Sequence, residues 1–226
     1  MSGQAGGGQG GRTEVIGVVV GLFQENTFLV REPAGTHAVV IDPGDEPEKI
    51  VRTLTSNGWE PLAILNTHGH LDHIGAVQEL KERYGIPFLL HEADEPLLRA
   101  TPDHARFFGV PVPRVPEVDR YLNDGDLLRF GRLEFRVHHT PGHTPGGVSF
   151  HIDERLFAGD TLFFDSIGRT DLPGGDHDTL LRSIRERLLS FPDETVVHSG
   201  HGPDTTIGRE RKSNPYLGTD ASADSQ

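Results

Sequence analysis

The chain has 226 residues, a length that suits one large domain or two small ones and is enough to bury a sizeable core. Its formal net charge of −13, with no block rich in Lys and Arg, argues against a nucleic-acid partner or an anionic membrane surface. Cysteine is absent, which excludes disulfides, thiolate metal ligands and a cysteine nucleophile. The longest apolar run, residues 15–23, is interrupted by glycines and is far shorter than the ~20 residues of a membrane span. We therefore expect a soluble, cytoplasmic protein.

Apolar runs and turn residues divide the chain into predicted elements. Residues 1–12 and 218–226 are predicted to be disordered tails that flank one domain over residues 13–217. The first half of that domain predicts strands at 15–20, 27–31, 38–41, 61–66 and 86–90, with helices at 46–56 and 74–84. The proline-rich segment 102–116 is predicted to be a surface connection. The second half predicts strands at 127–130, 133–138, 148–152, 156–157 and 195–198, and a helix at 179–189 that Asp176 or Asp178 could cap. Strand-rich halves interleaved with amphipathic helices favour an α/β sandwich of two packed sheets.

The segment NTHGHLDHIGA, residues 66–76, is the strongest functional signal. It follows a short apolar run that is typical of a buried strand, and it places His68, His70, Asp72 and His73 where that strand ends. A lone histidine is more often a surface or hydrogen-bonded residue than a ligand. Three adjacent imidazoles would repel one another if protonated, whereas neutral imidazoles and a carboxylate are good ligands for zinc, iron or manganese. The segment therefore predicts a metal site.

Three further candidate ligands follow other predicted strands. His143 lies in VHHTPGHTPGG (137–147), Asp160 in LFAGDTLF (156–163) and His201 in VVHSGHGP (196–203). Each segment alone is weak evidence, because Pro-Gly and Gly-Asp are turn formers first. Together with residues 66–76 they give four strand-end loops that each offer a ligand, a coincidence that chance does not easily produce.

These motifs are similar to those of the metallo-β-lactamase-fold hydrolases. The resemblance rests on Thr67–His73 (T-H-x-H-x-D-H), Pro141–Thr144 (P-G-H-T), Gly159–Thr161 (G-D-T) and Gly200–Gly202 (G-H-G), and it extends over nearly all of residues 13–217. Within that superfamily the chain resembles the short, single-domain bacterial form of glyoxalase II, the hydroxyacylglutathione hydrolases. The segments SIGRTDLPGGD (166–176) and GHGPDTTIGRERKSNPYL (201–218) carry this closer likeness.

The resemblance implies an αββα sandwich with a dinuclear metal site at the edge of its sheets. It assigns His68, His70 and His143 to one metal. It assigns Asp72, His73 and His201 to the other, with Asp160 as the bridge. Two divalent ions are expected, zinc first, with iron or manganese left open because histidine and carboxylate ligands accept all three.

The expected chemistry is hydrolysis of a small-molecule thioester. Two divalent cations that share a water lower its pKa to near neutrality, so a metal-bound hydroxide is the expected nucleophile and no serine or cysteine is required. A thiolate leaving group, whose conjugate acid has a pKa of about 8.5, departs without a strong general acid. Asp72, as a proton shuttle, and Asp160, as the metal bridge, are the expected catalytic carboxylates. The predicted activity is the hydrolysis of hydroxyacyl thioesters such as S-lactoylglutathione.

Alternatives of other classes stay open at this point. Two-domain glyoxalase II enzymes bind glutathione through a helical C-terminal domain, and this sequence, which stops soon after SNPYL, offers no residues that match it. The thiol carrier is therefore open. A persulfide dioxygenase with a single iron has a similar fold and also carries a G-R-T-D segment. A non-catalytic metal-binding protein is a third reading, made improbable by the intact ligand set. A nuclease is disfavoured by the charge, and a flavodiiron protein by the histidine at position 70.

Residues around the motifs have weaker predictions. Asp42, which ends an early strand, either orients a ligand histidine or starts a turn before Pro43. Thr67 and Thr144 are assigned either hydrogen bonds near the ligands or turn roles. Arg169 and Asp171 are expected to pair, and His177 is expected at a helix start rather than in the lining of the pocket. The histidines read as solvent-exposed or packing residues are His37, His91, His104, His138, His139, His151 and His198.

Overall fold

The computed structural model describes residues 12–218. Except for Arg12 and Gly218, the tails predicted to be disordered lie outside the described residues. Within the described range, no helix is both long and apolar enough to cross a membrane.

The first sheet contains six strands in the order of the chain. They are β1 (Glu14–Val20), β2 (Glu25–Arg31), β3 (His37–Ile41), β4 (Glu60–Leu65), β5 (Phe88–His91) and β6 (Arg120–Leu122). β1, β2 and β3 pair antiparallel, and β3, β4, β5 and β6 pair parallel. Because the carboxyl ends of parallel strands meet at one edge, the loops after β3, β4 and β5 lie side by side.

The second sheet has the order β14-β13-β10-β9-β8-β7. Its strands are β7 (Leu127–Phe130), β8 (Leu133–His139), β9 (Val148–Ile152), β10 (Arg155–Gly159), β13 (Val196–Ser199) and β14 (Thr205–Thr206), and β11 (Leu162–Phe163) and β12 (Ser166–Ile167) form a separate hairpin. β10 and β13 are parallel, and β8 runs in the same direction because both β8 and β10 pair antiparallel with β9. The loops after β8, β10 and β13 therefore share an edge.

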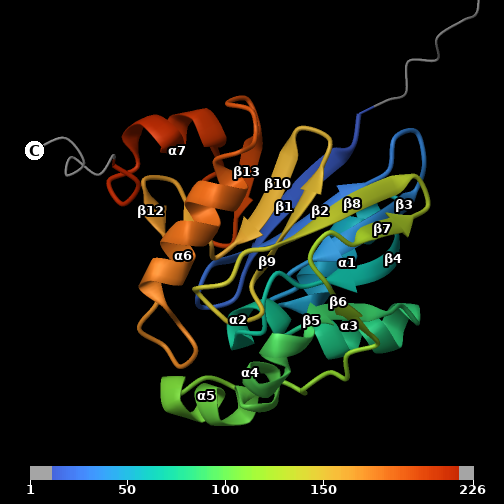
Figure 1. Cartoon of the computed structure of the whole chain (residues 1–226). Coiled ribbons are helices and arrows are strands. Elements are labelled where there is room, and N and C mark those ends of the chain that lie inside the picture. Colours follow the sequence, from blue (N-terminus) through green and yellow to red (C-terminus); the bar gives the residue numbers. More distant parts are fainter. Residues whose placement is uncertain (1–11, 219–226) are drawn as a thin grey trace, which may run out of the picture.

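The helices cover the two outer faces of the paired sheets, as Figure 1 shows. They are α1 (Pro47–Ser56), α2 (Leu71–Ile74), α3 (Val77–Tyr84), α4 (Glu95–Arg99), α5 (Thr101–Phe108), α6 (His177–Ser183) and α7 (Ile207–Ser213), with a 3-10 turn at Glu92–Asp94 and a π-helical segment at Ile184–Leu188. β3 shows why the layers form. Its alternate residues Ala38 and Val40 join the apolar cluster under α1 and α3, whereas Val39 and Ile41 join the cluster between the sheets. A third apolar cluster joins the second sheet to α6 and α7, so the predicted αββα sandwich is confirmed.

The structure corrects several predicted elements. The segment 102–116 is not purely a connection, because α5 occupies its first part. Pro102 stands in the first turn of α5, where a missing N–H is tolerated, and Ala105 is buried. The helix predicted at 74–84 divides into α2 and α3, and the helix predicted at 179–189 continues from α6 into the π-helical segment. The short elements α4, α7, β6, β11, β12 and β14 were not predicted.

Candidate metal centre

All seven predicted ligands lie at the edge where the loops of the two sheets meet. The first sheet contributes the loop after β4 and the short helix α2, which together carry His68, His70, Asp72 and His73. The second sheet contributes His143 after β8, Asp160 after β10 and His201 after β13. Parallel strand direction within each sheet is what brings side chains far apart in the sequence to one place.

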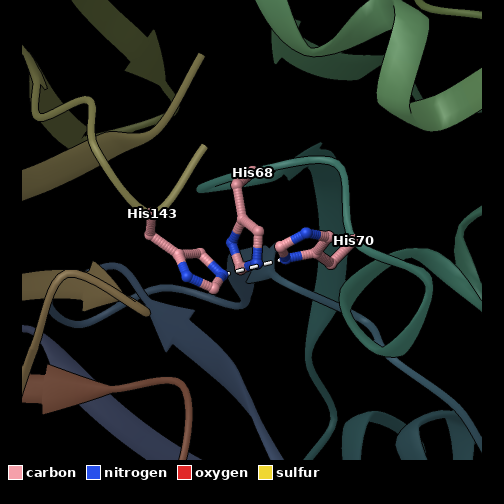
Figure 2. Close-up of side chains that lie close together, drawn as sticks. All are labelled: His68, His70 and His143. Atoms are coloured by element: carbon pink, nitrogen blue, oxygen red, sulfur yellow. Dashed lines mark hydrogen bonds between the residues drawn. The ribbon is translucent and has the colours of Figure 1, made fainter. Parts of the chain in front are cut away.

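Three imidazoles from two loops face one another in the first group. Figure 2 shows the rings of His68, His70 and His143 directed toward a common point, and one nitrogen of each lies within 4.8 Å of the others. Nδ1 of His70 lies 2.9 Å from Nε2 of His143. Burial is the main cause, and the charge of His143 the second, of a pKa of about 3 for His70. This imidazole is therefore neutral at neutral pH. Its lone pair is available to a cation.

The second group combines one carboxylate with two imidazoles. Ligand atoms of Asp72, His73 and His201 also lie within 4.8 Å of one another. Nε2 of His201 is 3.3 Å from Oδ2 of Asp72. Burial raises the pKa of Asp72, but the hydrogen bond with His201 and the charge of His73 outweigh that effect and hold the pKa below its ordinary value. The group therefore offers an ionised carboxylate beside two ring nitrogens.

Asp160 lies between the two groups. Its Oδ1 is 3.4 Å from Nε2 of His73, and its Oδ2 is 3.6 Å from Nε2 of both His143 and His201. Desolvation favours the protonated acid, but the charge of His73 prevails and the pKa of Asp160 falls well below its usual range. The preceding Gly159 has φ +48°, and a Cβ there would lie 2.2 Å from Oγ1 of Thr67. Glycine thus lets the Asp160 loop approach the histidine loop closely.

Unpartnered buried atoms provide a test of whether the residues fit metal ions. The buried atoms that lack a hydrogen-bond partner among the described residues include Nε2 of His68, both ring nitrogens of His73 and Oδ1 of Asp160. An unsatisfied buried polar atom costs about 1–3 kcal/mol, so several in one place indicate a missing partner. Imidazole nitrogens and carboxylate oxygens are ligands of divalent cations such as zinc. The donor set fits two such ions.

In three of the candidate ligand histidines, Nδ1 lies against an oxygen atom of a neighbouring residue. Nδ1 of His143 donates to the carbonyl of Arg169 at 2.7 Å, and Nδ1 of His201 donates to the carbonyl of Phe23 at 3.1 Å. Nδ1 of His68 lies 3.0 Å from Oγ1 of Thr67. With Nδ1 engaged, each ring presents the lone pair of Nε2 to the site, which is how neighbouring groups orient metal-binding histidines.

Asp42 occupies the orienting position that the sequence left open. Its backbone has φ +49° at the end of β3. Its Oδ1 accepts a hydrogen bond from the amide of Thr67 at 2.7 Å, and its Oδ2 lies 3.2 Å from Nδ1 of His73. Sequence reasoning missed Glu25, whose Oε1 lies 3.8 Å from the same ring nitrogen and whose pKa burial raises well above its ordinary value. Only its place at the start of a strand could have drawn attention to it.

Asp94 was also missed, although it joins the two loops that carry the first group. Its fully buried carboxylate accepts hydrogen bonds from the amide of Gly69 at 2.9 Å, the hydroxyl of Thr144 at 2.8 Å and the amide of Gly146 at 2.6 Å. A Cβ on Gly146 would lie 2.7 Å from Cγ of Asp94, so this approach requires glycine. The available signal was its position just after β5, at the same edge as the ligand loops.

The remaining predictions near the site agree with the structure. Arg169 and Asp171 form a two-point ion pair on the surface, at 2.7 and 2.8 Å. Asp176 caps α6 through the amide of Thr179, and His177 is the first residue of that helix. None of the histidines read as bystanders belongs to a candidate metal group within the described part of the chain. His198, for example, is buried and stacks on Phe157 with ring centroids 4.7 Å apart.

Comparison with known proteins places this site in a family. The profile of the Metallo-beta-lactamase superfamily matches residues 20–201. The chain belongs to that superfamily. The hydroxyacylglutathione hydrolase GloC of Haemophilus influenzae, one similar relative, is 40% identical over 204 residues, which cover 88% of this chain and 96% of GloC. The probable metallo-hydrolase YqgX of Bacillus subtilis is 40% identical over 203 residues, which cover 88% of this chain and 94% of the relative.

Solved structures of the superfamily share the fold. The BLEG-1 B3 metallo-beta-lactamase superposes with a TM-score of 0.85 at 41% identity, over 90% of this chain and 99% of that one. TTHA1623, solved in a di-iron-bound form, gives a TM-score of 0.83 at 46% identity. The match covers 89% of this chain and 100% of TTHA1623. ETHE1 from Myxococcus xanthus gives a TM-score of 0.75 at 28% identity, and the match covers 89% of this chain and 83% of ETHE1. Together with the similarity to GloC and YqgX, the superfamily match supports a metal-dependent hydrolase, and the histidine and aspartate groups are its candidate sites for divalent ions.

Proposed function

We propose that the chain hydrolyses hydroxyacyl thioesters, with S-lactoylglutathione as the representative substrate. The observation that carries this proposal is the position of Asp160 between two ligand groups, where its carboxylate can bridge a pair of metal ions. The proposed ligands are His68, His70 and His143 for one ion, and Asp72, His73 and His201 for the other. The likeness to GloC supports the thioester class. The proposed partner is a small molecule, with no nucleic acid and no membrane.

The chain's own residues would position and screen the reacting groups. The two ligand groups would hold two divalent cations, zinc in the first instance and iron or manganese otherwise, which would supply Lewis acidity to a water and to the substrate carbonyl. The negative charge of Asp160 would reduce the repulsion between the two cations. The carbonyls of Arg169 and Phe23 fix the rings of His143 and His201.

Asp72 is the group placed to move a proton. Its carboxylate is 19% exposed, against 11% for that of Asp160, so it is the more accessible of the two. A thiol leaving group with a pKa of about 8.5 needs little help from an acid. Proton transfer by Asp72 therefore assists the reaction without being its main source of rate.

A persulfide dioxygenase with one iron is the second candidate function. The observation in its favour is the similarity to ETHE1, at 28% identity over most of both chains. The two functions differ in metal count and in their need for oxygen. An oxygenase needs one ion, whereas the hydrolase requires both ligand groups to be filled.

The test combines elemental analysis with an anaerobic assay. Protein from unsupplemented growth is analysed for zinc, iron and manganese, and then assayed with S-lactoylglutathione in the absence of oxygen. Two metals per chain and release of free thiol are expected. A single iron, with oxygen uptake in the presence of glutathione persulfide, would replace the hydrolase proposal with the dioxygenase.

A further inference from the structure

A cavity of about 180 Å³ opens beside the second ligand group, and apolar and polar atoms share its surface. One wall is the tip of the β1–β2 hairpin, residues 20–23, and the other is the segment 110–113 that follows α5. Asp72 of the second ligand group is also among the lining residues. We call this cavity the hairpin groove. The full lining consists of Val20, Gly21, Leu22, Phe23, Gly44, Asp45, Leu71, Asp72, Gly75, Val110, Pro111, Val112 and Pro113.

Large apolar side chains stand exposed around the hairpin groove. Leu22 is 80% exposed and Val112 is 48% exposed, one on each wall. Phe23 meets Phe108 edge to face at the rim, with ring centroids 5.8 Å apart. Exposed apolar residues gathered around one cavity make it a candidate binding surface. The wall is also joined to the candidate metal centre, because the carbonyl of Phe23 accepts the hydrogen bond from His201.

The charge of the hairpin groove is negative. Among the residues that line it, the charged ones are Asp45 and Asp72, and none is Lys or Arg. Asp45 belongs to neither ligand group, so metal binding does not neutralise it, and the described residues give it no ion pair. Lys49, close by in the sequence, donates to the carbonyl of Val19 at 2.7 Å and lies 3.5 Å from Glu46 instead.

Glutathione is poorly matched to such a surface. Its two carboxylates and single ammonium give a thioester of glutathione a net negative charge at neutral pH. A carboxylate placed near Asp45 would be repelled, and it would lose hydration against the apolar walls without gaining a cationic partner.

We propose that the hairpin groove binds the thiol arm of the substrate and favours apolar thiols without net negative charge over glutathione. This inference rests on the proposed thioester hydrolysis. A hydroxyacyl group such as lactoyl is short and stays with the carbonyl at the metal centre. The part of the substrate that extends past Asp72 between the two apolar walls is therefore the thiol arm.

The first experiment varies the thiol while the acyl group stays constant. Lactoyl thioesters of glutathione, of N-acetylcysteamine and of a longer uncharged alkyl thiol are compared by kcat/KM with the metal-loaded protein. The uncharged alkyl thioester is expected to be the best substrate and glutathione the poorest. Thioether analogues of the same thiols, which cannot be cleaved, are titrated by calorimetry and should bind in the same order.

Two pairs of variants locate the effect. Val112→Ser removes apolar surface from the groove and should lower kcat/KM for the alkyl thioester about fivefold. Val19→Ser alters a valine of similar exposure, 51% against 48%, that does not line the groove, and should leave it unchanged. Asp45→Lys should raise kcat/KM for the glutathione thioester about fourfold through KM, with little effect on uncharged thiols. Glu60→Lys makes the same charge change at the start of β4, away from the ligand edge, and should have no such selectivity.

The outcomes separate this inference from the proposed function. If lactoyl thioesters are cleaved but glutathione is preferred, or Val112→Ser and Asp45→Lys act no differently from their controls, the groove inference is wrong and the hydrolase remains. Selectivity that follows the acyl group and ignores the thiol also overturns it. If no thioester is cleaved with both metals bound, the proposed function fails. The order of analogue binding then decides the groove inference alone.

Discussion

Replacement of Asp94 by Asn tests whether the buried carboxylate between the ligand loops positions the metal centre. The change is nearly isosteric, but Asn keeps one acceptor oxygen and puts an amide donor in place of the other. Three donors face this side chain, from Gly69, Thr144 and Gly146. At least one of these donors would then face the NH₂ group of Asn and would have no acceptor.

The magnitude follows from the number and charge of those hydrogen bonds. A hydrogen bond to a charged group contributes about 1.5–3 kcal/mol, and an unpaired buried donor adds a penalty of similar size. Asp94→Asn should therefore lower the free energy of unfolding by about 3 kcal/mol. Because the same bonds hold the loops of His68 and His143 together, metal affinity should fall about tenfold to hundredfold, as for other residues that support metal ligands.

The assay is competition for metal with a chromophoric chelator, run at a temperature where circular dichroism shows the variant folded. Asp119→Asn is the matched control, because Asp119 also accepts a main-chain hydrogen bond, from Phe88 at 2.7 Å, but does not contact the ligand loops. It should lose some stability and keep its metal affinity. Wild-type affinity in Asp94→Asn, or an equal loss in Asp119→Asn, would refute the positioning role.

Other changes have equally specific expected results. Asp160→Asn should fold but bind both metals more weakly; two tightly held metals with full activity would show that Asp160 is not the bridge. His143→Ala should lose metal from one site by elemental analysis, whereas His139→Ala should keep the full stoichiometry, and the reverse result would exchange their roles. Burial lowers the pKa of His151, so below about pH 6.5 the unfolded chain binds protons that the folded chain resists, and stability falls as pH drops. His151→Gln should flatten that decline in urea unfolding between about pH 7.5 and 5.5, and an unchanged decline would remove His151 as its source.

The sequence predicted the fold best where local pattern and tertiary role coincide. In the run before residue 66, every residue that packs into one of the apolar clusters is itself apolar. The strand was therefore recognisable without knowledge of the strands beside it. The helix α5 was harder because Pro102 and the three prolines that follow the helix are typical of a connection, and only its packing, with Ala105 buried, distinguishes a helix there. The division between α2 and α3 falls at Gly75 and Ala76, where the amide of Ala76 donates to the carbonyl of Pro43 at 3.0 Å, a contact that spacing alone does not specify.

The candidate ligands were predictable because each lies in a short motif after a strand. Their supports were not, because Asp94 and Glu25 act through contacts with loops that are distant in the sequence. Asp94 reaches Gly146 across 52 positions, and no local pattern encodes that distance. A residue of this kind looks like an ordinary helix-start aspartate until the two loops it joins are seen together.

The origin of the ligands from both sheets links metal binding to the packing of the sandwich. Neither ligand group can assemble on one sheet, since the first needs His143 and the second needs His201 from the second sheet. Asn26 of β2 reinforces this connection, because its side chain donates to the carbonyls of Ser199 and Gly202 on either side of the His201 loop. The hairpin that carries Asn26 also forms a wall of the groove. The β1–β2 hairpin therefore connects the packing of the sheets, the His201 loop and the hairpin groove. We expect a change at the hairpin tip to alter thiol selectivity while the strands that position the candidate ligands keep their places.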